Sequence, residues 1–194
     1  SYSDYEIIVV LNGCTDNTEK VVKKFKRINL KYFSLSQAQV SKARNAGAFK
    51  AQGNILVFLD ADTQLAEDSL HTIQQQFHPP FSVATTKVLP DQSLLKYKIA
   101  MTFKNVYNSS KIYNGCSGIL ICRKEEFHKV GGYNSDLQVK EHHTLTKLLQ
   151  KTGKYKCINT YVTTSMRRHV QWGLLKGTWF WLMQWIKEKK HTVK

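Results

Sequence analysis

An apolar run that ends in two aspartates constrains this chain most. Residues 55–59 read ILVFL without a polar interruption, and Asp60-Ala61-Asp62 follows directly. A run this apolar is typical of a central parallel strand that helices cover on both faces. Elsewhere, β-branched apolar segments alternate with helical patterns. This alternation predicts an α/β fold built on a parallel sheet.

Local signals predict the remaining elements. Asn12-Gly13 marks a turn after the first strand, and Thr15 or Asp16 is a candidate cap for the helix that follows. Expected strands cover 6–11, 30–35, 55–59 and 82–89, and a turn feeds a further strand within 115–122. The first expected helix ends near residue 27, and the others cover 41–51, 66–77, 94–111, 124–130 and 141–152.

Composition indicates a globular chain with anionic partners. Its 194 residues are 42% hydrophobic and 22% charged, which suits one folded domain. The net charge of +15 fits nucleic acid, a phosphorylated small molecule or an anionic membrane surface, and does not choose among them. The four cysteines show no zinc-site spacing, and no apolar stretch reaches the ~20 residues of a spanning helix. We therefore expect a cytoplasmic protein, free or held peripherally on the inner face of the membrane.

Asp60 and Asp62 are the first candidates for chemistry. They follow the carboxyl end of a strand, where open α/β sheets bind their ligands. As the strand turns into a loop, the two carboxylates can converge on a cation and a diphosphate. Hard oxygen ligands favour Mg²⁺ or Mn²⁺. The alternative is that an aspartate here only caps the next helix.

Three segments together resemble a known family. Residues 6–18 (EIIVVLNGCTDNT), 41–47 (SKARNAG) and 53–62 (GNILVFLDAD), in this order, resemble the nucleotide-binding half of family 2 glycosyltransferases. Residues 118–132 and the helix that opens with Glu141 resemble the acceptor half. The resemblance implies a GT-A (Rossmann-like) fold, a mixed, mainly parallel sheet flanked by helices. The strand and helix with which the family usually begins are not found before residue 6.

The resemblance also implies roles at the donor site. Asn12 and Gly13 would form the turn against the base and ribose, and Arg44 would reach the nucleotide or its phosphates. A guanidinium grips a diphosphate well, although a surface helix position is the alternative for Arg44. Asp60 would hold the ribose or the metal, and Asp62 would ligate the metal.

Two further segments extend this implied site. Gln64 completes a DADxQ pattern similar to the metal motif of dolichol-phosphate mannosyltransferases, or is an exposed loop residue. Residues 163–169 (TTSMRRH) resemble a segment near the end of some family members. Arg167 and Arg168 would then close over the donor diphosphate, and His169 would supply a metal ligand. The alternative is a basic helix start that faces solvent.

The resemblance implies an inverting transfer in which an acidic residue removes a proton from the acceptor hydroxyl. The usual Glu-Asp pair before the acceptor helix is replaced here by Glu141-His142. Histidine titrates near neutral pH, so His142 is the expected base, with Glu141 as the second candidate. Alternatively, both residues simply begin the helix, where Glu141 complements the helix dipole.

The C-terminal segment, 169–194, differs from the preceding domain, 1–168. Five apolar residues recur at spacings of 3, 4, 3 and 4, namely Trp172, Leu175, Trp179, Leu182 and Ile186. This spacing predicts a helix with an apolar face. Tryptophan with flanking lysine is typical of helices that lie in a membrane surface. Docking of the helix onto the sheet is the alternative.

Taken together, the sequence predicts a metal-dependent glycosyltransferase. It would move a sugar from a nucleotide-diphosphate donor to the hydroxyl of a lipid-linked, glycan or protein acceptor. The missing aspartate at His142 leaves open a domain that binds nucleotide sugar without catalysis. The net charge and clustered aromatic residues would also suit a nucleic-acid-binding protein. However, the basic residues are spread along the chain and no such module is recognisable, so no nucleic-acid partner is expected.

Overall fold

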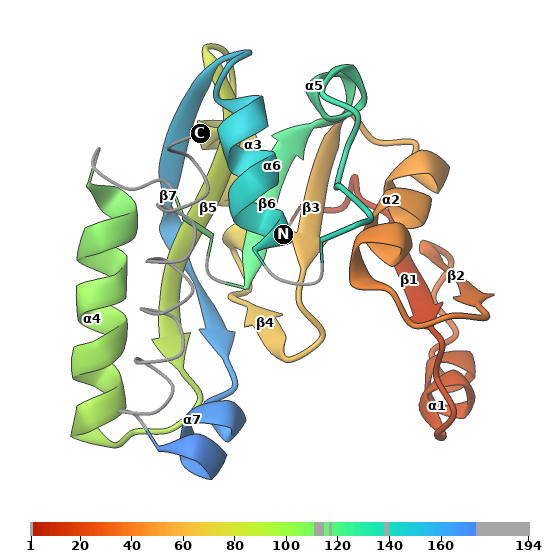
Figure 1. The fold of residues 1–194 in the computed structure, drawn as a ribbon, viewed down its shortest axis with the longest axis horizontal. Helices are drawn as coiled ribbons and strands as arrows, with labels where there is room; N and C mark the ends of the chain where they lie inside the picture. The colour runs from red at the N-terminus through yellow and green to blue at the C-terminus, as the bar shows by residue number, and fades with distance from the viewer. Residues whose placement is uncertain (1, 111–114, 117, 138–139, 174–194) are drawn as a thin grey trace.

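A computed structural model describes residues 2–110, 115–116, 118–137 and 140–173 (Figure 1). Its strands are β1 (Ile7–Asn12), β2 (Leu30–Leu35), β3 (Ile55–Leu59), β4 (Thr63–Leu65), β5 (Phe81–Pro90), β6 (Ile119–Arg123) and β7 (Lys154–Thr164). Its helices are α1 (Thr18–Lys24), α2 (Val40–Lys50), α3 (Ser69–Gln76), α4 (Leu95–Ser109), α5 (Lys124–Lys129), α6 (Glu141–Leu149) and α7 (Arg167–Trp172).

The described strands form two sheets. β1 and β2 pair in parallel and carry α1 and α2, at the right of Figure 1. The larger sheet has the order β3-β6-β5-β7-β4, in which β5 and β7 are parallel and the other neighbours are antiparallel. The α/β class with a mixed sheet is confirmed, although antiparallel pairings outnumber parallel ones among the described strands.

The core lies on both faces of the larger sheet. Successive residues of β6 point to opposite faces, as strand geometry requires. Ile119 and Ile121 pack with α3 and α4 on one face, whereas Leu120 and Cys122 pack with α5 and α6 on the other. All four are fully buried. The sheet is therefore covered by helices on both sides, and α6 stands in front of it in Figure 1.

The apolar run 55–59 does form a strand, but its predicted place in the sheet was wrong. β3 lies at the edge of the larger sheet and pairs antiparallel with β6, and no described strand joins it to β1. Its run is uninterrupted because both faces are covered: Leu56 packs in one cluster, while Ile55 and Val57 pack against the other. An uninterrupted apolar run indicates that both faces of a strand are buried. It does not distinguish a parallel from an antiparallel neighbouring strand.

Several predicted boundaries also move. α1 ends at Lys24 rather than near residue 27, and α6 ends at Leu149 rather than at 152. α3 begins at Ser69 instead of 66, because 63–65 pair with β7 as the short strand β4 and the Ala66 amide still bonds Tyr161 of β7 before a turn leads to Ser69. The longest strand, β7, was not predicted at all. Some of its buried residues are polar and some of its exposed residues are apolar, so the sequence does not show the alternation of polar and apolar residues that marks a strand.

Gly118, just before β6, supports the turn that follows β3. Its backbone adopts φ +75°, and its carbonyl accepts a hydrogen bond from the Asp60 amide at 2.9 Å. A Cβ at this position would lie 2.6 Å from the Thr63 hydroxyl oxygen. Thr63 cannot easily move aside, because it is buried and its hydroxyl bonds that of Thr164 at 3.1 Å. The Asp60 turn therefore needs glycine at this position.

We expect Gly118→Ala to destabilise the fold more than Gly131→Ala. Both positions have positive φ, which costs a non-glycine residue about 1–2 kcal/mol. Only Gly118 adds a steric clash, of roughly 1–3 kcal/mol, since a Cβ on Gly131 meets nothing within 4 Å. Urea unfolding of the two variants measures the difference. Equal losses of stability would contradict the packing described for Gly118.

Candidate active site

The candidate site begins where β3 ends. Asp60 follows the last residue of this strand, and its carbonyl accepts a hydrogen bond from the Thr63 amide at 3.0 Å. This bond and the one to Gly118 close a turn of which Asp60 forms the first residue. The Asp60 side chain is partly exposed, and Asp62 is exposed further along the same turn. The turn thus presents its carboxylates at the surface rather than in the core.

Arg44 from α2 connects two carboxylates across the site. One guanidinium nitrogen lies 2.7 Å from Asp60 Oδ1 and the other lies 2.8 Å from Glu141 Oε1. The Arg44 side chain is only 16% exposed, so these are charge-assisted bonds in a partly dehydrated setting. Arg44 and Asp60, which the sequence placed together at the donor site, do meet, and Glu141 joins them. The helix-surface alternative for Arg44 is wrong.

The charges around Asp60 change its acidity. Burial acts to raise the pKa of Asp60, but His142 and the Arg44 guanidinium outweigh burial and hold the pKa below its ordinary value. A cation beside a carboxylate favours the ionised form. Asp60 is therefore an anion over the physiological pH range.

His142, the second residue of α6, lies beside Asp60. Its Nε2 is 3.6 Å from Asp60 Oδ1, beyond hydrogen-bond length, and has no hydrogen-bond partner among the described residues. Its Nδ1 lies 2.9 Å from the Tyr133 hydroxyl. The imidazole is thus held at one nitrogen, while the other is directed at a carboxylate.

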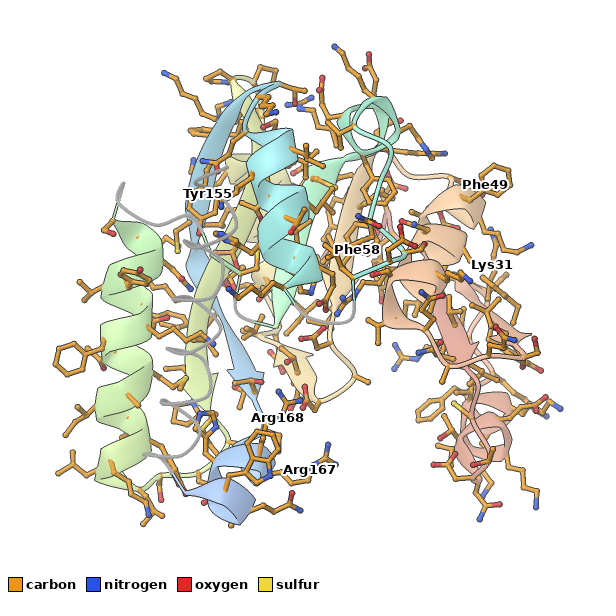
Figure 2. All side chains as sticks on the ribbon, in the orientation of Figure 1. Lys31, Phe49, Phe58, Tyr155, Arg167 and Arg168 are labelled. Carbon is orange, nitrogen blue, oxygen red and sulfur yellow. The ribbon has the colours of Figure 1, made fainter. Side chains whose placement is uncertain are left out.

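Tyr133 is a site residue that was not predicted from the sequence. Its ring packs edge-on against Phe58 of β3, with centroids 5.1 Å apart, and the Arg44 guanidinium lies 5.3 Å from its centroid. Figure 2 shows Phe58 on β3. Asn45 bonds both the amide and the carbonyl of Tyr133, at 2.9 and 2.8 Å. The only sequence signal near Tyr133 is the preceding Gly131-Gly132. This pair predicts a turn but gives no indication that Tyr133 contacts His142.

Asp62 and Gln64 lie further along the same chain segment. The Asp62 carbonyl accepts a hydrogen bond from the Ser165 amide at 3.0 Å, and Gln64 of β4 pairs with Thr163 of β7. Within the described residues, no hydrogen bond or ion pair involves the Asp62 carboxylate. An exposed carboxylate without a partner remains available to bind a cation.

Asn12 ends β1 and Gly13 follows it. The Asn12 side-chain oxygen accepts the Gln39 amide at 2.7 Å, directly before α2 begins. Gly13 has φ +63°, and a Cβ there would lie 2.6 Å from the Ala38 nitrogen. This turn therefore fixes the start of the helix that carries Arg44. Its predicted contact with a base and ribose stays a prediction.

Arg167, Arg168 and His169 all belong to α7. Both arginines are exposed and appear on the short helix at the bottom of Figure 2. The Ser165 bond to Asp62 brings the start of this helix to the Asp62 turn. Burial, with the nearby cations Lys104 and Arg168, lowers the pKa of His169. A neutral imidazole is the form that binds metals, and the role of His169 stays a prediction.

The residues present fit a hard cation bound with a diphosphate. Among the described residues, no three His, Cys, Asp or Glu side chains group closely enough to hold a metal by themselves. However, Mg²⁺ commonly uses one or two carboxylates and takes its other ligands from phosphates and water. The unpaired Asp62 beside Asp60 supplies such a set. Gln64 adds an amide oxygen on the exposed side of the neighbouring strand.

Comparison with known proteins identifies the family of the chain. A family model described as Glycosyl transferase family 2 matches residues 1–131, more than half of the chain. The chain belongs to glycosyl transferase family 2. It is similar to the glycosyltransferase GlyA of Streptococcus pneumoniae, 31% identical over 78 residues, and to an uncharacterised glycosyltransferase of Haemophilus influenzae, 36% identical over 74 residues. These matches cover 39% and 36% of the chain, and 11% and 29% of the relatives.

Solved structures confirm the GT-A fold of this family 2 domain. A Pyrobaculum calidifontis mannosyltransferase, PcManGT, solved with GDP-Man and Mn²⁺, superposes with a TM-score of 0.62 at 18% identity, over 81% of this chain and 47% of that one. S. aureus TarS 1–349 gives a TM-score of 0.64 at 18% identity, over 84% of this chain and 51% of that one. The domain therefore spans about half the length of these structures. None of its described helices is long and apolar enough to cross a membrane.

The Asp60 carboxylate makes the stability of the domain depend on pH. Its folded pKa lies below the ordinary 3.8. Its stabilising contribution is therefore complete above that value and is lost as the pH falls through the lower folded pKa. Between about pH 5 and about pH 2.5, the wild type should lose more unfolding free energy than Asp60→Asn. Urea unfolding with a chelator present measures this, with Asp68→Asn as an exposed control. Identical pH profiles for wild type and Asp60→Asn would contradict the ion-paired carboxylate.

Proposed function

We propose that this domain transfers a sugar from a nucleoside diphosphate to an acceptor hydroxyl, with Mg²⁺ or Mn²⁺ held by Asp60 and Asp62. The observation that carries the proposal is the unpaired Asp62 carboxylate on the turn that Asp60 begins. A fold shared with a mannosyltransferase solved with GDP-Man and Mn²⁺ supports this assignment. The acceptor would be a lipid, a glycan or a protein, and the net charge of +15 suits an anionic donor.

The donor side of the site combines several cationic and polar groups. Gln64 and His169 would complete the metal ligands. Arg167 and Arg168, which follow the Ser165 contact with Asp62, would bind the diphosphate oxygens. A guanidinium suits this task because its planar fork can contact two oxygens. Asn12 and Gly13 would receive the base and ribose.

A divalent cation bound here would neutralise charge on the departing diphosphate, which lowers the barrier to breaking the sugar–phosphate bond. Arg44 would also position the carboxylates, because it pairs with both Asp60 and Glu141. Its contact with the nucleotide or its phosphates stays a prediction. His142 and the Arg44 charge together lower the pKa of Asp60 and keep it ionised, and an ionised carboxylate is the form that binds both a metal and a ribose hydroxyl.

His142 is the proposed base that activates the acceptor. When the Tyr133 oxygen accepts a hydrogen bond from Nδ1–H, the lone pair of Nε2 is free to take a proton. Nε2 is the nitrogen without a hydrogen-bond partner among the described residues, and Asp60 at 3.6 Å stabilises the imidazolium that forms. Attack opposite the leaving group would invert the anomeric carbon. Glu141 is less suited to this role because its carboxylate is already paired with Arg44.

We expect Asp62→Asn to remove the metal dependence of nucleotide binding. In the wild type, Mn²⁺ should strengthen binding of GDP or UDP, because Asp60 and Asp62 would hold the cation where its charge would attract the diphosphate. Without the Asp62 charge, the increase in nucleotide affinity caused by Mn²⁺ should be smaller by roughly tenfold or more, which corresponds to about 1.4 kcal/mol. Calorimetric titration of each nucleotide with Mn²⁺ and with chelator measures the effect.

The matched control for this experiment is Asp68→Asn. Asp68 is exposed on the same segment and makes no side-chain cap bond to α3, so its replacement removes the same charge from outside the site. It should bind nucleotide as the wild type does. If the wild type binds no nucleoside diphosphate with Mn²⁺, the proposed function is wrong.

Replacing His142 should slow the reaction without weakening donor binding. We expect His142→Ala to reduce nucleoside diphosphate release from a GDP- or UDP-sugar by roughly 100-fold or more, the usual contribution of a general base. Tyr133→Phe should cause a smaller loss, since the ring packing remains. The control is His71→Ala, an exposed histidine on α3 across the sheet.

The same measurements separate catalysis from binding alone. A wild-type domain that binds nucleotide sugar with Mn²⁺ but releases no diphosphate, even with candidate acceptors, would be a non-catalytic binding domain. Full turnover by His142→Ala would remove this residue from the base role. In that case, Glu141→Gln becomes the variant that decides between the two candidates.

A further inference from the structure

Helix α4 carries an apolar stripe on the face that points away from the core. Tyr97, Met101 and Asn108 are its buried residues and pack toward the larger sheet. On the opposite side of the helix lie four exposed apolar residues, Leu95, Ile99, Phe103 and Val106. Their spacing of 4, 4 and 3 places them on one helical face. Helix α4 is thus apolar on two opposite faces, of which the described fold covers one.

The exposure of this stripe is large and continuous. Leu95 is 71% exposed, Phe103 is 73% exposed and Val106 is 65% exposed. Single exposed apolar side chains are ordinary on protein surfaces, whereas a run of them along one helix marks an interaction site. Figure 1 shows α4 at the outer edge of the molecule, with its far side unobstructed by other labelled elements.

The charges of α4 indicate what the stripe binds. The helix contains Lys96, Lys98 and Lys104 and no Asp or Glu. By helical spacing, Lys96 and Lys98 lie on either side of the stripe. An apolar helix face flanked by lysine is the pattern of helices that lie in an anionic bilayer surface. The apolar residues enter the acyl boundary while the ammonium groups reach the phosphates.

Helix α7 lies near the start of α4. The Asp91 side chain, just before α4, accepts the Met166 amide at 2.8 Å, and Met166 packs in the same cluster as Tyr97. Figure 1 places α7 next to the first turn of α4. Among its exposed side chains are Val170 and Trp172, and the Arg168 guanidinium lies 6.0 Å from the Trp172 ring. Aromatic and basic residues thus continue beyond the stripe.

We propose that the outer face of α4, together with α7, binds the surface of an anionic lipid bilayer. The apolar stripe on α4 shares no residue with the sugar-transfer site and does not depend on the proposed function, whereas α7 also carries Arg167 and Arg168, which that function assigns to the donor diphosphate. A second copy of the chain fits the face less well. If two α4 helices packed together, lysines of one would lie near lysines of the other. Neither helix has a carboxylate to offset this repulsion, so the contact is unfavourable.

Vesicle sedimentation with the full chain tests this surface. The probe is phosphatidylcholine vesicles with about a third phosphatidylglycerol, and vesicles of phosphatidylcholine alone. The variant Ile99→Asp with Phe103→Asp should lose at least tenfold in binding to the anionic vesicles. Replacing Lys96 and Lys98 by Gln should also weaken binding and reduce its dependence on salt, since fewer charges contact the lipid.

The matched control is Ile28→Asp with Phe49→Asp. Both residues are more exposed than Ile99 and Phe103 and lie outside α4 and α7, so the control replaces the same residue types, removes at least as much exposed apolar surface and makes the same charge change. Residues 174–194 are present in every variant, so any binding through them is common to all. Light scattering measures the oligomeric state, and thermal unfolding confirms that each variant folds.

Selective loss of anionic-vesicle binding in the α4 variant supports the proposal. Three results would overturn it: equal binding by the α4 variant and the control, equal binding to both vesicle types, or a dimer that the α4 variant dissociates while vesicle binding stays unchanged. Nucleotide binding by the same samples reports on the sugar-transfer site. A failure of one proposal is therefore distinguishable from a failure of the other.

Discussion

The ion pairs of Arg44 connect parts of the fold that are distant in sequence. The guanidinium joins α2 to the turn after β3 through Asp60, and to the start of α6 through Glu141, 97 residues away. The Arg44 side chain is only 16% exposed, so these bonds form in a partly dehydrated setting and are screened less than fully exposed ion pairs. Arg44 is therefore one of the side chains that set the relative placement of the two halves at the site, together with Asn45 of the same helix, which bonds the Tyr133 backbone. Gly47, on the same helix, allows α2 to pack closely on Val10 of β1.

Behind this ion-pair cluster, an aromatic group fixes the remaining side chains. Tyr133 packs against Phe58 and Phe127, and Asn45 holds its backbone by two hydrogen bonds. A close-packed environment leaves the tyrosine few orientations, so its hydroxyl stays within reach of His142. The site consists of charged groups toward the solvent and a rigid apolar support beneath them. Such support is what holds reacting groups in position.

The sequence predicted the parts of this site that depend on neighbouring residues. Asp60 and Asp62 were identified because a buried strand and its end can be recognised locally. Tyr133 was not, because its role comes from contacts with α2, β3 and α6 that no local pattern records. The same reasoning applies to β4 and β7. Their pairing makes Thr63–Leu65 a strand where the sequence predicted no element, and pairing partners lie far apart in sequence.

The charge balance of the cluster explains how a histidine can stand where the family usually has an aspartate. Asp60 and Glu141 already place two carboxylates around one guanidinium. His142 Nε2 lies 3.6 Å from Asp60 Oδ1, and a third carboxylate at position 142 would bring another negative charge toward Asp60, which would favour protonation of one of the two. A neutral imidazole avoids that repulsion, and a protonated one brings the cluster to zero net charge. A histidine at position 142 is thus compatible with the placement of Arg44 between Asp60 and Glu141. The histidine and the ion pairs of Arg44 form one charge-balanced cluster.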